Sequence, residues 1–443
     1  MSGTSPYFPG KWVRSFSSET LISVASAVIF FLLDILDVMM CIFFRVLDGF
    51  LEGKPSSCYC VKTEEIQEET REDSNVDEGE SGLSETLHGR KNVFRKMGLL
   101  RIPRIWGKEV ACCVGKGNRW SDCGCESCLS PMSNGSDSRL HVVVKEQEKA
   151  RRENDRNETT QQNVIFIHGF LSSSSVWKET VFPNLSEDSN QYYRLFAVDL
   201  FGFGSSPKPR DCFYTMRDHV EMIEKSVIVP FEVKSFHLVG HSMGCVVALA
   251  LAAKYPEYAK TITLIAPPYF SSSEGEGSAE ALRRLCPRRV WPPLLFGSAF
   301  MSWYEHLGRC VCFFICRNHR LWEGILKLLT RRRDLHFLLV DLTRHTHHSA
   351  WHTMHNVICG GAKFSDKYLE TLRAARVKIR VVQGTEDQIV PVDCSYNMKM
   401  KAPEIIELEI IPNADHNTVI LGRTKEFTRD LERFWASADK NIA

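Results

Sequence analysis

The stretch Phe236-His-Leu-Val-Gly-His-Ser-Met-Gly-Cys245 decides the fold of this chain. Its apolar first half predicts a buried strand, which ends at Gly240-His-Ser-Met-Gly244 and is followed at once by a helical sequence, residues 244–255. A serine at such a strand-to-helix turn exposes its hydroxyl above the edge of the sheet. Glycine two positions to either side lets the strand and the helix approach closely. We therefore predict that Ser242 is a nucleophile.

Apolar runs on both sides of this turn predict the rest of a sheet. The runs are apolar throughout and alternate with helix-length segments, which is typical of a mostly parallel sheet covered by helices on both faces. They occupy residues 141–145, 164–167, 193–198, 236–239, 261–265, 377–382 and 406–411. The fold class is therefore predicted to be α/β, with a core made of residues 140–268 and 376–443.

The alternation of strands and helices stops between Tyr269 and Ala375. The stretch is dense in Trp, Phe, Cys, Arg and His, and we predict that residues 269–375 form an inserted helical cap. Apolar residues such as Trp291, Phe300 and Trp303 would suit an acyl chain, while some of them form the core of the cap itself.

A neutral serine needs an adjacent base that is itself held by an acid. On this fold the order along the chain is serine, acid, histidine, with both partners on loops after later strands. Strand 377–382 leads into Gln383-Gly-Thr-Glu-Asp387, and strand 406–411 leads into Pro412-Asn-Ala-Asp-His416. We predict Asp387 as the acid and His416 as the base. The competing carboxylates Glu386, Asp393 and Asp415 are the kind that more often cap turns or face solvent.

A tetrahedral intermediate also needs two backbone N–H donors for its oxyanion. The sequence offers Met243, directly after the nucleophile, and Phe170, in the turn His168-Gly-Phe170 that ends the strand 164–167. We predict this pair as the oxyanion hole. His168, which is followed by glycine, is expected to hold the turn in place and not to act as a base.

The N-terminal region carries a membrane or secretory signal. Lys11 and Arg14 precede an uncharged run from residue 21 to residue 33, and apolar character continues to Phe44. Bulky residues at the end of the run favour a retained anchor over a cleaved signal peptide. One helical face collects Asp34, Asp37, Cys41, Arg45 and Asp48. This stripe argues for a tilted, interfacial or partnered helix, and we predict residues 1–60 as a membrane anchor or signal region.

Charge and cysteine content exclude some functions and leave others open. The 443 residues carry 55 Lys plus Arg against 54 Asp plus Glu, so the chain lacks the excess of positive charge that is typical of nucleic-acid-binding proteins. Residues 61–90 are acidic and predict a disordered linker. Residues 91–139 are rich in cysteine, with Cys112, Cys113, Cys123, Cys125 and Cys128. Disulfides, free thiols and zinc all remain open for them, although adjacent Cys112 and Cys113 do not have the spacing of a zinc pair.

Three histidines of the predicted cap, His348, His352 and His355, fall on one helical face. No carboxylate accompanies them, and we expect polar packing and not a metal site. The juxtamembrane thiols Cys58 and Cys60 are candidates for acylation or for ordinary pairing. The sequence assigns no metal ligand and no cofactor, and it leaves the oligomeric state open.

The motifs together resemble a known family. The turn at Ser242, the His168-Gly-Phe170 loop, Asp199-Leu-Phe-Gly-Phe-Gly-Ser-Ser206, Asp387 and His416 resemble a capped α/β-hydrolase of the lipase and esterase type. Arg119-Trp-Ser-Asp-Cys-Gly-Cys-Glu-Ser-Cys128, the string 345–360 and the apolar N-terminus are similar to the plant BODYGUARD group. The resemblance implies a probable lysophospholipase or cuticle-forming hydrolase that acts on lipid or cutin esters, anchored at the cell membrane or secreted to the cell wall.

Three functions are therefore considered. The leading prediction is hydrolysis of a carboxylic ester through an acyl-serine intermediate. Transfer of the acyl group to an alcohol, as in polyester assembly, would use the same machinery. A ligand receptor that retains the triad is the alternative from another class, and the apolar N-terminus argues against it because such receptors are typically soluble.

Overall fold

The computed structural model describes residues 13–53, 83–87, 119–129, 139–147, 162–210, 212–270, 277–286 and 302–439, with the side chains of the first helix from residue 27 on. Several predictions fall on residues outside these ranges. They concern most of the acidic linker, Cys58, Cys60, Cys112, Cys113, Trp291 and Phe300.

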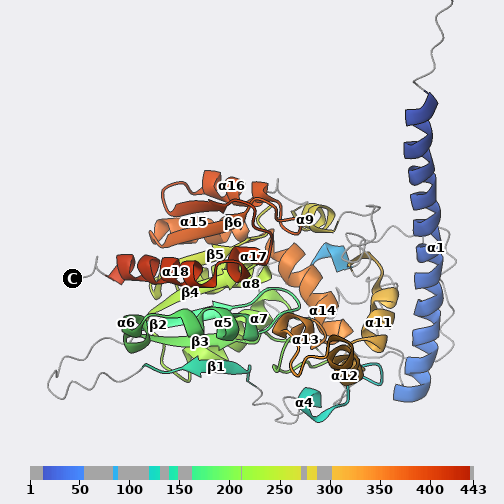
Figure 1. The fold of residues 1–443 in the computed structure, drawn as a ribbon, viewed down its shortest axis with the longest axis horizontal. Coiled ribbons are helices and arrows are strands. Elements are labelled where there is room, and N and C mark those ends of the chain that lie inside the picture. The colour runs from blue at the N-terminus through green and yellow to red at the C-terminus, as the bar shows by residue number, and fades with distance from the viewer. Residues whose placement is uncertain are drawn as a thin grey trace, which may run out of the picture.

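A seven-stranded sheet forms the centre of the molecule (Figure 1), in the order β1-β3-β2-β4-β5-β6-β7. Only the pairing of β1 with β3 is antiparallel, and the other neighbours run parallel. The strands are β1 Val142–Lys145, β2 Gln162–Ile167, β3 Tyr193–Val198, β4 Phe236–His241, β5 Ala259–Ile265, β6 Lys378–Gly384 and β7 Ile406–Ile411. All seven predicted strands are present, and the mostly parallel α/β fold is confirmed.

Both faces of the sheet are covered, which explains why its central strands carry apolar residues on both faces. Along β2, Val164 and Phe166 belong to one apolar cluster, while Ile165 and Ile167 belong to the other. Successive side chains of a strand point to opposite faces, so each cluster lies on its own side of the sheet. All six residues of β2 are buried, as expected for a central strand of a doubly covered sheet.

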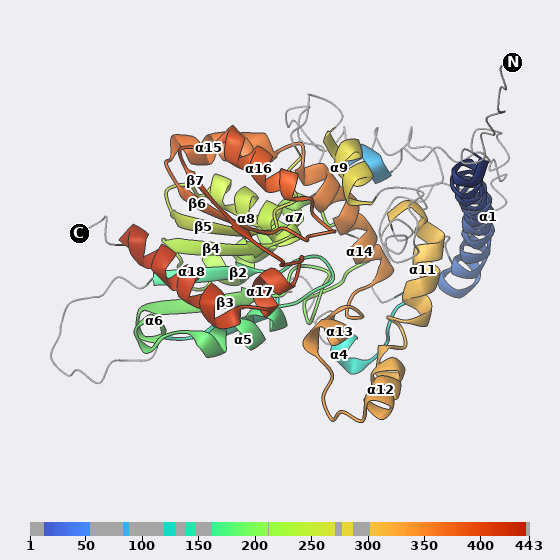
Figure 2. The same cartoon turned by 45° about the horizontal axis from the view of Figure 1, so that its top comes forward.

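Different helices cover the two faces (Figure 2). One face packs against α5 Ser175–Thr180, α17 Thr418–Leu421 and α18 Thr424–Asp439, and the short elements η4 Phe182–Asn184 and α6 Glu187–Tyr192 continue this layer. The other face packs against α7 Met216–Ile223, α8 Met243–Lys254 and α15 Ser365–Ala374, with η5 Glu224–Ile228 and α16 Val392–Lys401 at its margins. Helix α8, which follows the predicted nucleophile, is buried from Met243 to Ala252.

The described part of the segment between β5 and β6 consists mainly of helices joined by short loops. It contains α9 Gly277–Leu285, α11 Glu305–Phe314, α12 His319–Thr330, α13 Phe337–Asp341, α14 His347–Thr353 and η6 Met354–Cys359 before α15. Helix α15 packs directly on α8, whereas α11 and α14 pack on each other farther from the sheet. Two short elements from the N-terminal part, η1 Glu85–Leu87 and α4 Glu126–Leu129, join this region, with η1 against α9 and η6.

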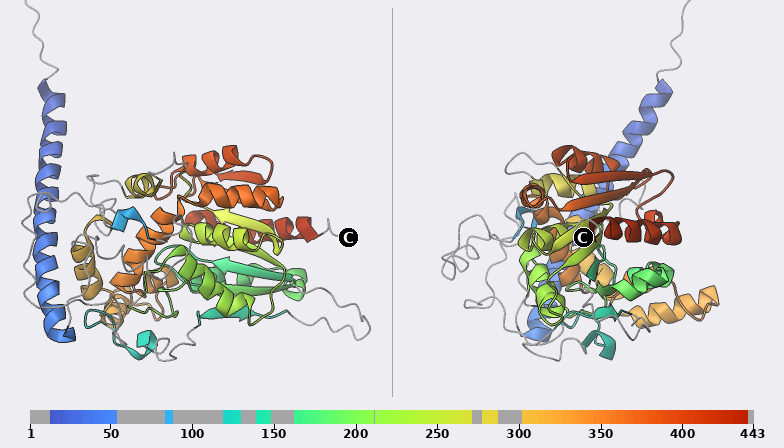
Figure 3. Two further views of the ribbon diagram at one scale, coloured as in Figure 1. Left: turned by 180° about the vertical axis from the view of Figure 1, so that it is seen from behind. Right: turned by 90° about the vertical axis from the view of Figure 1, so that its left-hand side faces the viewer.

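Helix α1, Val13–Glu52, lies along the outer side of α11 and extends beyond the rest of the molecule (Figures 1 and 3). Its buried residues are Phe30, Asp37, Cys41, Phe44 and Asp48. Their spacing keeps them on one face of the helix, so the polar stripe that the sequence predicted is the face that contacts α11. The opposite face exposes Phe31, Leu32, Met39, Phe43 and Phe50, among other apolar side chains.

Two acidic residues attach α1 to α11. Asp37 accepts backbone hydrogen bonds from His306 and Leu307, in the first turn of α11, at 2.9 and 3.1 Å. Such donors have no partner within their own helix. One helical turn farther along α11, the two terminal guanidinium nitrogens of Arg309 donate to the Asp48 carboxylate at 2.7 and 2.6 Å. Helix α1 is therefore a partnered helix, one of the three arrangements that its polar stripe predicted.

Candidate active site

Ser242 occupies a strained turn between β4 and α8. Its backbone has φ 52° and ψ −120°, in the left-handed half of conformational space that side chains other than glycine rarely adopt. The conformation is locked because the Ser242 N–H donates to the Ile265 carbonyl at 2.8 Å, and the Ser242 carbonyl accepts from the Cys245 N–H at 2.9 Å. Strain held by surrounding structure in this way is common where a side chain must be presented for chemistry.

The two glycines of the turn are required by close backbone contact. A Cβ atom on Gly240 would lie 2.7 Å from the Gly244 carbonyl oxygen, and one on Gly244 would lie 2.5 Å from the Ile167 carbonyl oxygen. Real Cβ atoms do not approach backbone this closely. The pattern G-x-S-x-G therefore reflects the close approach of strand and helix, which leaves no room for a side chain at either glycine.

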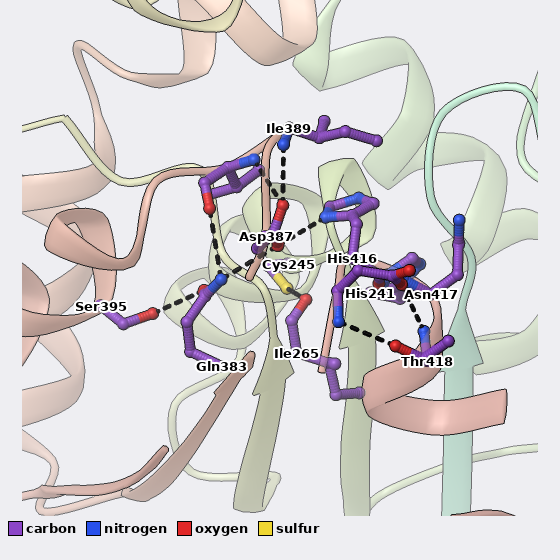
Figure 4. A network of polar contacts seen from close by, with 12 residues as sticks. His241, Cys245, Ile265, Gln383, Asp387, Ile389, Ser395, His416, Asn417 and Thr418 are labelled. Atoms are coloured by element: carbon purple, nitrogen blue, oxygen red, sulfur yellow. Dashed lines mark hydrogen bonds and ion pairs between the residues drawn. The ribbon is translucent and has the colours of Figure 1, made fainter. Parts of the chain in front are cut away.

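Asp387 and His416 come together at the ends of β6 and β7 (Figure 4). The Nδ1–H of His416 donates to Oδ2 of Asp387 at 2.8 Å. Asp387 also accepts from the backbone N–H groups of Ile389 and Val390, both at 2.9 Å, and from the Gln383 amide at 2.9 Å. Burial would raise the pKa of Asp387, but the bonds from His416 and the two backbone donors outweigh it and hold the pKa below its usual value. Asp387 therefore remains an anion.

His416 also lies directly against the turn at Ser242. The imidazoles of His416 and His241 are 4.8 Å apart between ring centroids. Nε2 of His241 donates to the carbonyl oxygen of His416 at 3.0 Å, because a carbonyl can only accept. This bond ties two loops that are 175 residues apart in sequence. The structure thus brings the predicted base beside the turn that carries the predicted nucleophile.

The loop His168-Gly-Phe170 covers the turn from the other side. A Cβ atom on Gly169 would lie 3.2 Å from Cβ of Ser242, so the loop touches the serine itself. Met243 is the first residue of α8, and its N–H is one of the donors that a helix leaves without an internal acceptor. The two predicted oxyanion donors therefore belong to the two segments that meet at Ser242.

Comparison with known proteins places the chain in a family. Residues 162–285 match the family described as alpha/beta hydrolase fold. The chain is 50% identical over 419 residues to "Probable lysophospholipase BODYGUARD 4" of Arabidopsis thaliana. The aligned region covers 93% of this chain and 96% of that protein. The chain belongs to the BODYGUARD family. "Probable lysophospholipase BODYGUARD 5" and "Probable lysophospholipase BODYGUARD 1" of the same plant are 47% and 38% identical, over 93% and 94% of this chain.

The predicted BODYGUARD resemblance and the α/β-hydrolase fold are confirmed by these matches. The relatives are named as probable lysophospholipases, which are ester hydrolases, and the prediction of an ester-hydrolysing enzyme is confirmed at the level of enzyme class. The sequence string 345–360 that pointed to the BODYGUARD group lies in α14 and η6 of the cap region.

Two further residues of the BODYGUARD chain, His168 and Asp199, connect the loops that follow β2 and β3. His168 accepts from the Leu200 N–H at Nε2, 2.8 Å, so its Nδ1 carries the proton and donates to the Gly169 carbonyl at 2.7 Å. Asp199 accepts from the N–H groups of Ser174 and Ser205 at 2.6 and 2.7 Å. His168 thus has the structural role that was predicted. The role of Asp199 was missed, although Asp199 opens the string 199–206 and lies directly after the buried strand β3.

The competing carboxylates have other positions in the BODYGUARD fold. Asp415 caps α17 by accepting from the N–H groups of Asn417 and Thr418 at 2.9 and 2.7 Å. Glu386 and Asp393 are exposed to solvent, whereas the Asp387 side chain has no exposed surface. Of the four acidic residues considered from sequence, only Asp387 has a hydrogen bond with the His416 imidazole in the described structure.

The three histidines of the cap face different partners. His348 donates from Nε2 to the Cys212 carbonyl at 2.9 Å, His352 packs on the ring of Phe213, and His355 lies 2.9 Å from the Thr86 hydroxyl. They form no ligand cluster among the described residues. The rings of His348 and His352 also pack on each other, with their centroids 4.2 Å apart.

Proposed function

We propose that this chain is a serine hydrolase that cleaves carboxylic esters of lipids through an acyl-serine intermediate. The proposal rests above all on one observation: the His416–Asp387 pair lies against the strained turn that carries Ser242. In this proposal Ser242 is the nucleophile, His416 the general base and Asp387 its orienting acid. The N–H groups of Met243 and Phe170 form the oxyanion hole.

The hydrogen bond to Asp387 sets the protonation of His416. Because Nδ1 of His416 carries the proton that Asp387 accepts, Nε2 of the neutral ring is left with a lone pair. That nitrogen takes the proton of the Ser242 hydroxyl as the serine oxygen bonds to the ester carbonyl carbon. The anion of Asp387 stabilises the imidazolium that forms, without taking a proton itself.

The remaining steps follow from the same atoms. The carbonyl oxygen becomes an oxyanion and accepts from the Met243 and Phe170 N–H groups, each donor contributing roughly 100- to 1,000-fold to the rate. His416 returns its proton to the leaving alcohol, and the acyl group stays on Ser242. Water, deprotonated by His416, then releases the free acid and restores the serine.

Helix α1 supports the proposal of a retained membrane anchor. Its stretch from Ala27 to Glu52 is 26 residues long and apolar enough to cross a membrane by length and composition. A cleaved signal peptide would not be expected to form a buried ion pair with the mature protein, as Asp48 does with Arg309. We propose that α1 stays attached through its polar stripe and turns its exposed apolar face to lipid.

A membrane-associated position suits a lipid ester as substrate, either a lysophospholipid or an ester of the plant cuticle. The names of the relatives favour the lysophospholipid. The cuticular ester and a place in cuticle formation rest on the resemblance to the BODYGUARD group alone. Residues 269–375 are proposed as the cap that receives the acyl chain, and each methylene buried there would contribute about 0.8 kcal/mol.

The proposal is tested by chromatographic analysis of the products from a lysophospholipid with a labelled acyl chain. The full-length protein in detergent should release labelled free fatty acid, and Ser242→Ala should release none above background. If the label moves instead to an added long-chain alcohol, the chain is an acyltransferase. Binding of the lipid without turnover would contradict both enzymatic readings and favour a receptor.

Among p-nitrophenyl esters, octanoate should have a higher kcat/KM than acetate, and equal values would contradict an acyl-binding cap.

A further inference from the structure

Three cysteines and one histidine outside the proposed active site converge on a single point. Cys123, Cys125 and Cys128 belong to a short segment, residues 119–129, which we name the cysteine knuckle. His319 is the first residue of α12 in the cap region. The three sulfur atoms and a ring nitrogen of His319 all lie within 4.8 Å of one another. The thiols and the imidazole come from positions about 190 residues apart, as the separation of 191 between Cys128 and His319 illustrates.

The distances in this cluster match the edges of a zinc tetrahedron. Zn–S bonds of about 2.3 Å and Zn–N bonds of about 2.0–2.1 Å, at tetrahedral angles, place sulfur and nitrogen ligands roughly 3.6 Å apart. Nε2 of His319 lies 3.4 Å from the sulfur of Cys125 and 3.6 Å from that of Cys128. The ligand types also fit, because Cys3His is one of the common structural zinc sets.

A second, independent feature is the hydrogen bond on the other side of the imidazole. Nδ1 of His319 lies 3.1 Å from a carboxylate oxygen of Glu323, one helical turn along α12. A carboxylate can only accept, so Nδ1 carries the proton and Nε2 presents a lone pair to the thiols. Metal-ligating histidines in proteins nearly always have such an outer partner, which fixes the tautomer and orients the ring.

The backbone of the knuckle is also arranged around a sulfur. The Cys125 N–H points to the sulfur of Cys123 at 3.4 Å, so a donor faces the position where a thiolate would carry negative charge. Lys208 is buried nearby and interacts electrostatically with Cys128. Three thiolates and one neutral imidazole around Zn²⁺ have a net charge of −1, which the Lys208 ammonium would offset.

Disulfide formation does not account for this cluster. In the part of the chain that the structure describes, no disulfide joins any two of these three cysteines. Three sulfurs cannot all pair among themselves, and a disulfide between any two would leave the third thiol and the oriented imidazole without a role.

We propose that Cys123, Cys125, Cys128 and His319 bind one Zn²⁺ as a closed, four-coordinate structural site. Binding replaces the three thiol protons, which pass to solvent, with three Zn–S bonds and adds one Zn–N bond. The metal fastens the knuckle to α12. The knuckle in turn contacts the junction of α1 and α11, because Trp120 donates to Asp48 at 2.7 Å and Ser121 accepts from Arg309 at 3.1 Å. The zinc site thus stabilises the attachment of helix α1 to the cap, and this role is independent of ester hydrolysis.

A neighbouring group of ligand atoms has to be separated from this site in any experiment. Cys312, Cys316 and His345 also lie within 4.8 Å of one another and offer three ligand atoms instead of four. The experiment therefore compares the metal content of matched variants. A metal ion bound by Cys312, Cys316 and His345 would be present in each of them and would cancel in the difference.

The first test is elemental analysis of the full-length protein, purified in detergent without chelators. The double variant Cys125→Ser/Cys128→Ser should contain one molar equivalent of zinc less than the wild type. Cys310→Ser is the matched control, because Cys310 lies in α11 outside both clusters and its loss should leave the zinc content unchanged. Equal zinc in the double variant and the wild type would overturn the proposal. So would a disulfide among the three cysteines, found by mass spectrometry after alkylation without reduction.

A second variant, Glu323→Gln, tests the proposal even if the double variant does not fold. Glu323→Gln removes the outer carboxylate, whose side chain is 22% exposed, and leaves all four ligands in place. Loss of such a partner typically costs 10- to 100-fold in metal affinity. In a competition titration with a chromophoric zinc chelator, Glu323→Gln should release one equivalent of zinc at roughly 10-fold lower chelator concentration than the wild type. Superimposable titration curves for the two proteins would contradict a zinc ion on His319.

Discussion

His241 donates a hydrogen bond from Nε2 to the main-chain carbonyl of His416 at 3.0 Å, and so joins the serine turn to the loop that carries the proposed base. Burial lowers the pKa of His241 to about 3, so the ring stays neutral in the folded protein and keeps its single proton for this bond. His241 is a positioning residue, because its contact is with the backbone of His416 and not with a reacting atom.

The first prediction concerns this bond. His241→Leu should lower kcat about 10- to 100-fold with little change in KM, because a displacement near 1 Å at a reacting group costs about that much. His241→Gln, which can still donate a hydrogen bond, should recover much of the loss. Steady-state kinetics on a p-nitrophenyl ester would measure both. A parallel rise in KM, or no recovery in the glutamine variant, would mean that His241 only fills space.

The second prediction separates Asp387 from its acidic neighbour Asp415. Asp387→Asn should lower kcat roughly 10,000-fold, the size of the effect in serine proteases, because the amide no longer holds His416 in the productive tautomer. Asp415→Asn should retain most of the activity, since Asp415 only caps α17. Near-equal activities of the two variants would contradict the assignment of the acid.

The third prediction concerns the attachment of α1. The Asp48 and Arg309 side chains are 1% and 7% exposed, so Arg309→Met leaves a buried carboxylate without its partner. Such a change costs about 3–5 kcal/mol in similar pairs, and limited proteolysis should cut the α1 junction much faster than in the wild type. The control is Arg210→Met, whose partner Glu52 also lies in α1 but whose side chain is 23% exposed. That variant should lose less than about 1 kcal/mol. Equal protease resistance in both variants would show that the buried pair does not hold α1.

The fourth prediction is a dependence of stability on pH. His219 in α7 is fully buried beside Phe201 and Tyr214, and both of its ring nitrogens lack a hydrogen-bond partner within the described structure. Burial, helped by the nearby His168, lowers the pKa of His219 to about 3. The unfolded chain takes up this proton near pH 6.5 and the folded chain does not. The free energy of unfolding should therefore fall between pH 6.5 and pH 3, by about 2 kcal/mol from this residue at pH 5.

Chemical denaturation at pH 7 and pH 5 would measure this effect. In His219→Phe the difference in unfolding free energy between the two pH values should be smaller than in the wild type by about 2 kcal/mol. His336→Gln, at an exposed position before α13, should keep the wild-type difference. A His219→Phe variant with the same pH dependence as the wild type would exclude His219 as the source.

Much of the fold and the proposed triad could be predicted from the sequence because their signals are local. Most strands of the sheet contain a short apolar run, and Ser242, Asp387 and His416 each follow within a few residues of a strand end. The role of Asp199 and the pairing of Asp48 with Arg309 could not be predicted in this way, since each depends on a contact between distant segments. The zinc proposal shows the same limit. Cys125 and Cys128 have a zinc-like spacing, but His319 is 191 residues away from Cys128 in the sequence, and only the fold places it beside the thiols.

The most direct test of the central claim is mass spectrometry of the intact protein after reaction with a fluorophosphonate, followed by peptide mapping of the adduct. The account predicts one adduct per chain, on Ser242, formed quickly in the wild type and absent in Ser242→Ala. His416→Ala should form it far more slowly. An adduct on another residue, or an unmodified Ser242 in folded protein that still hydrolyses esters, would contradict the account.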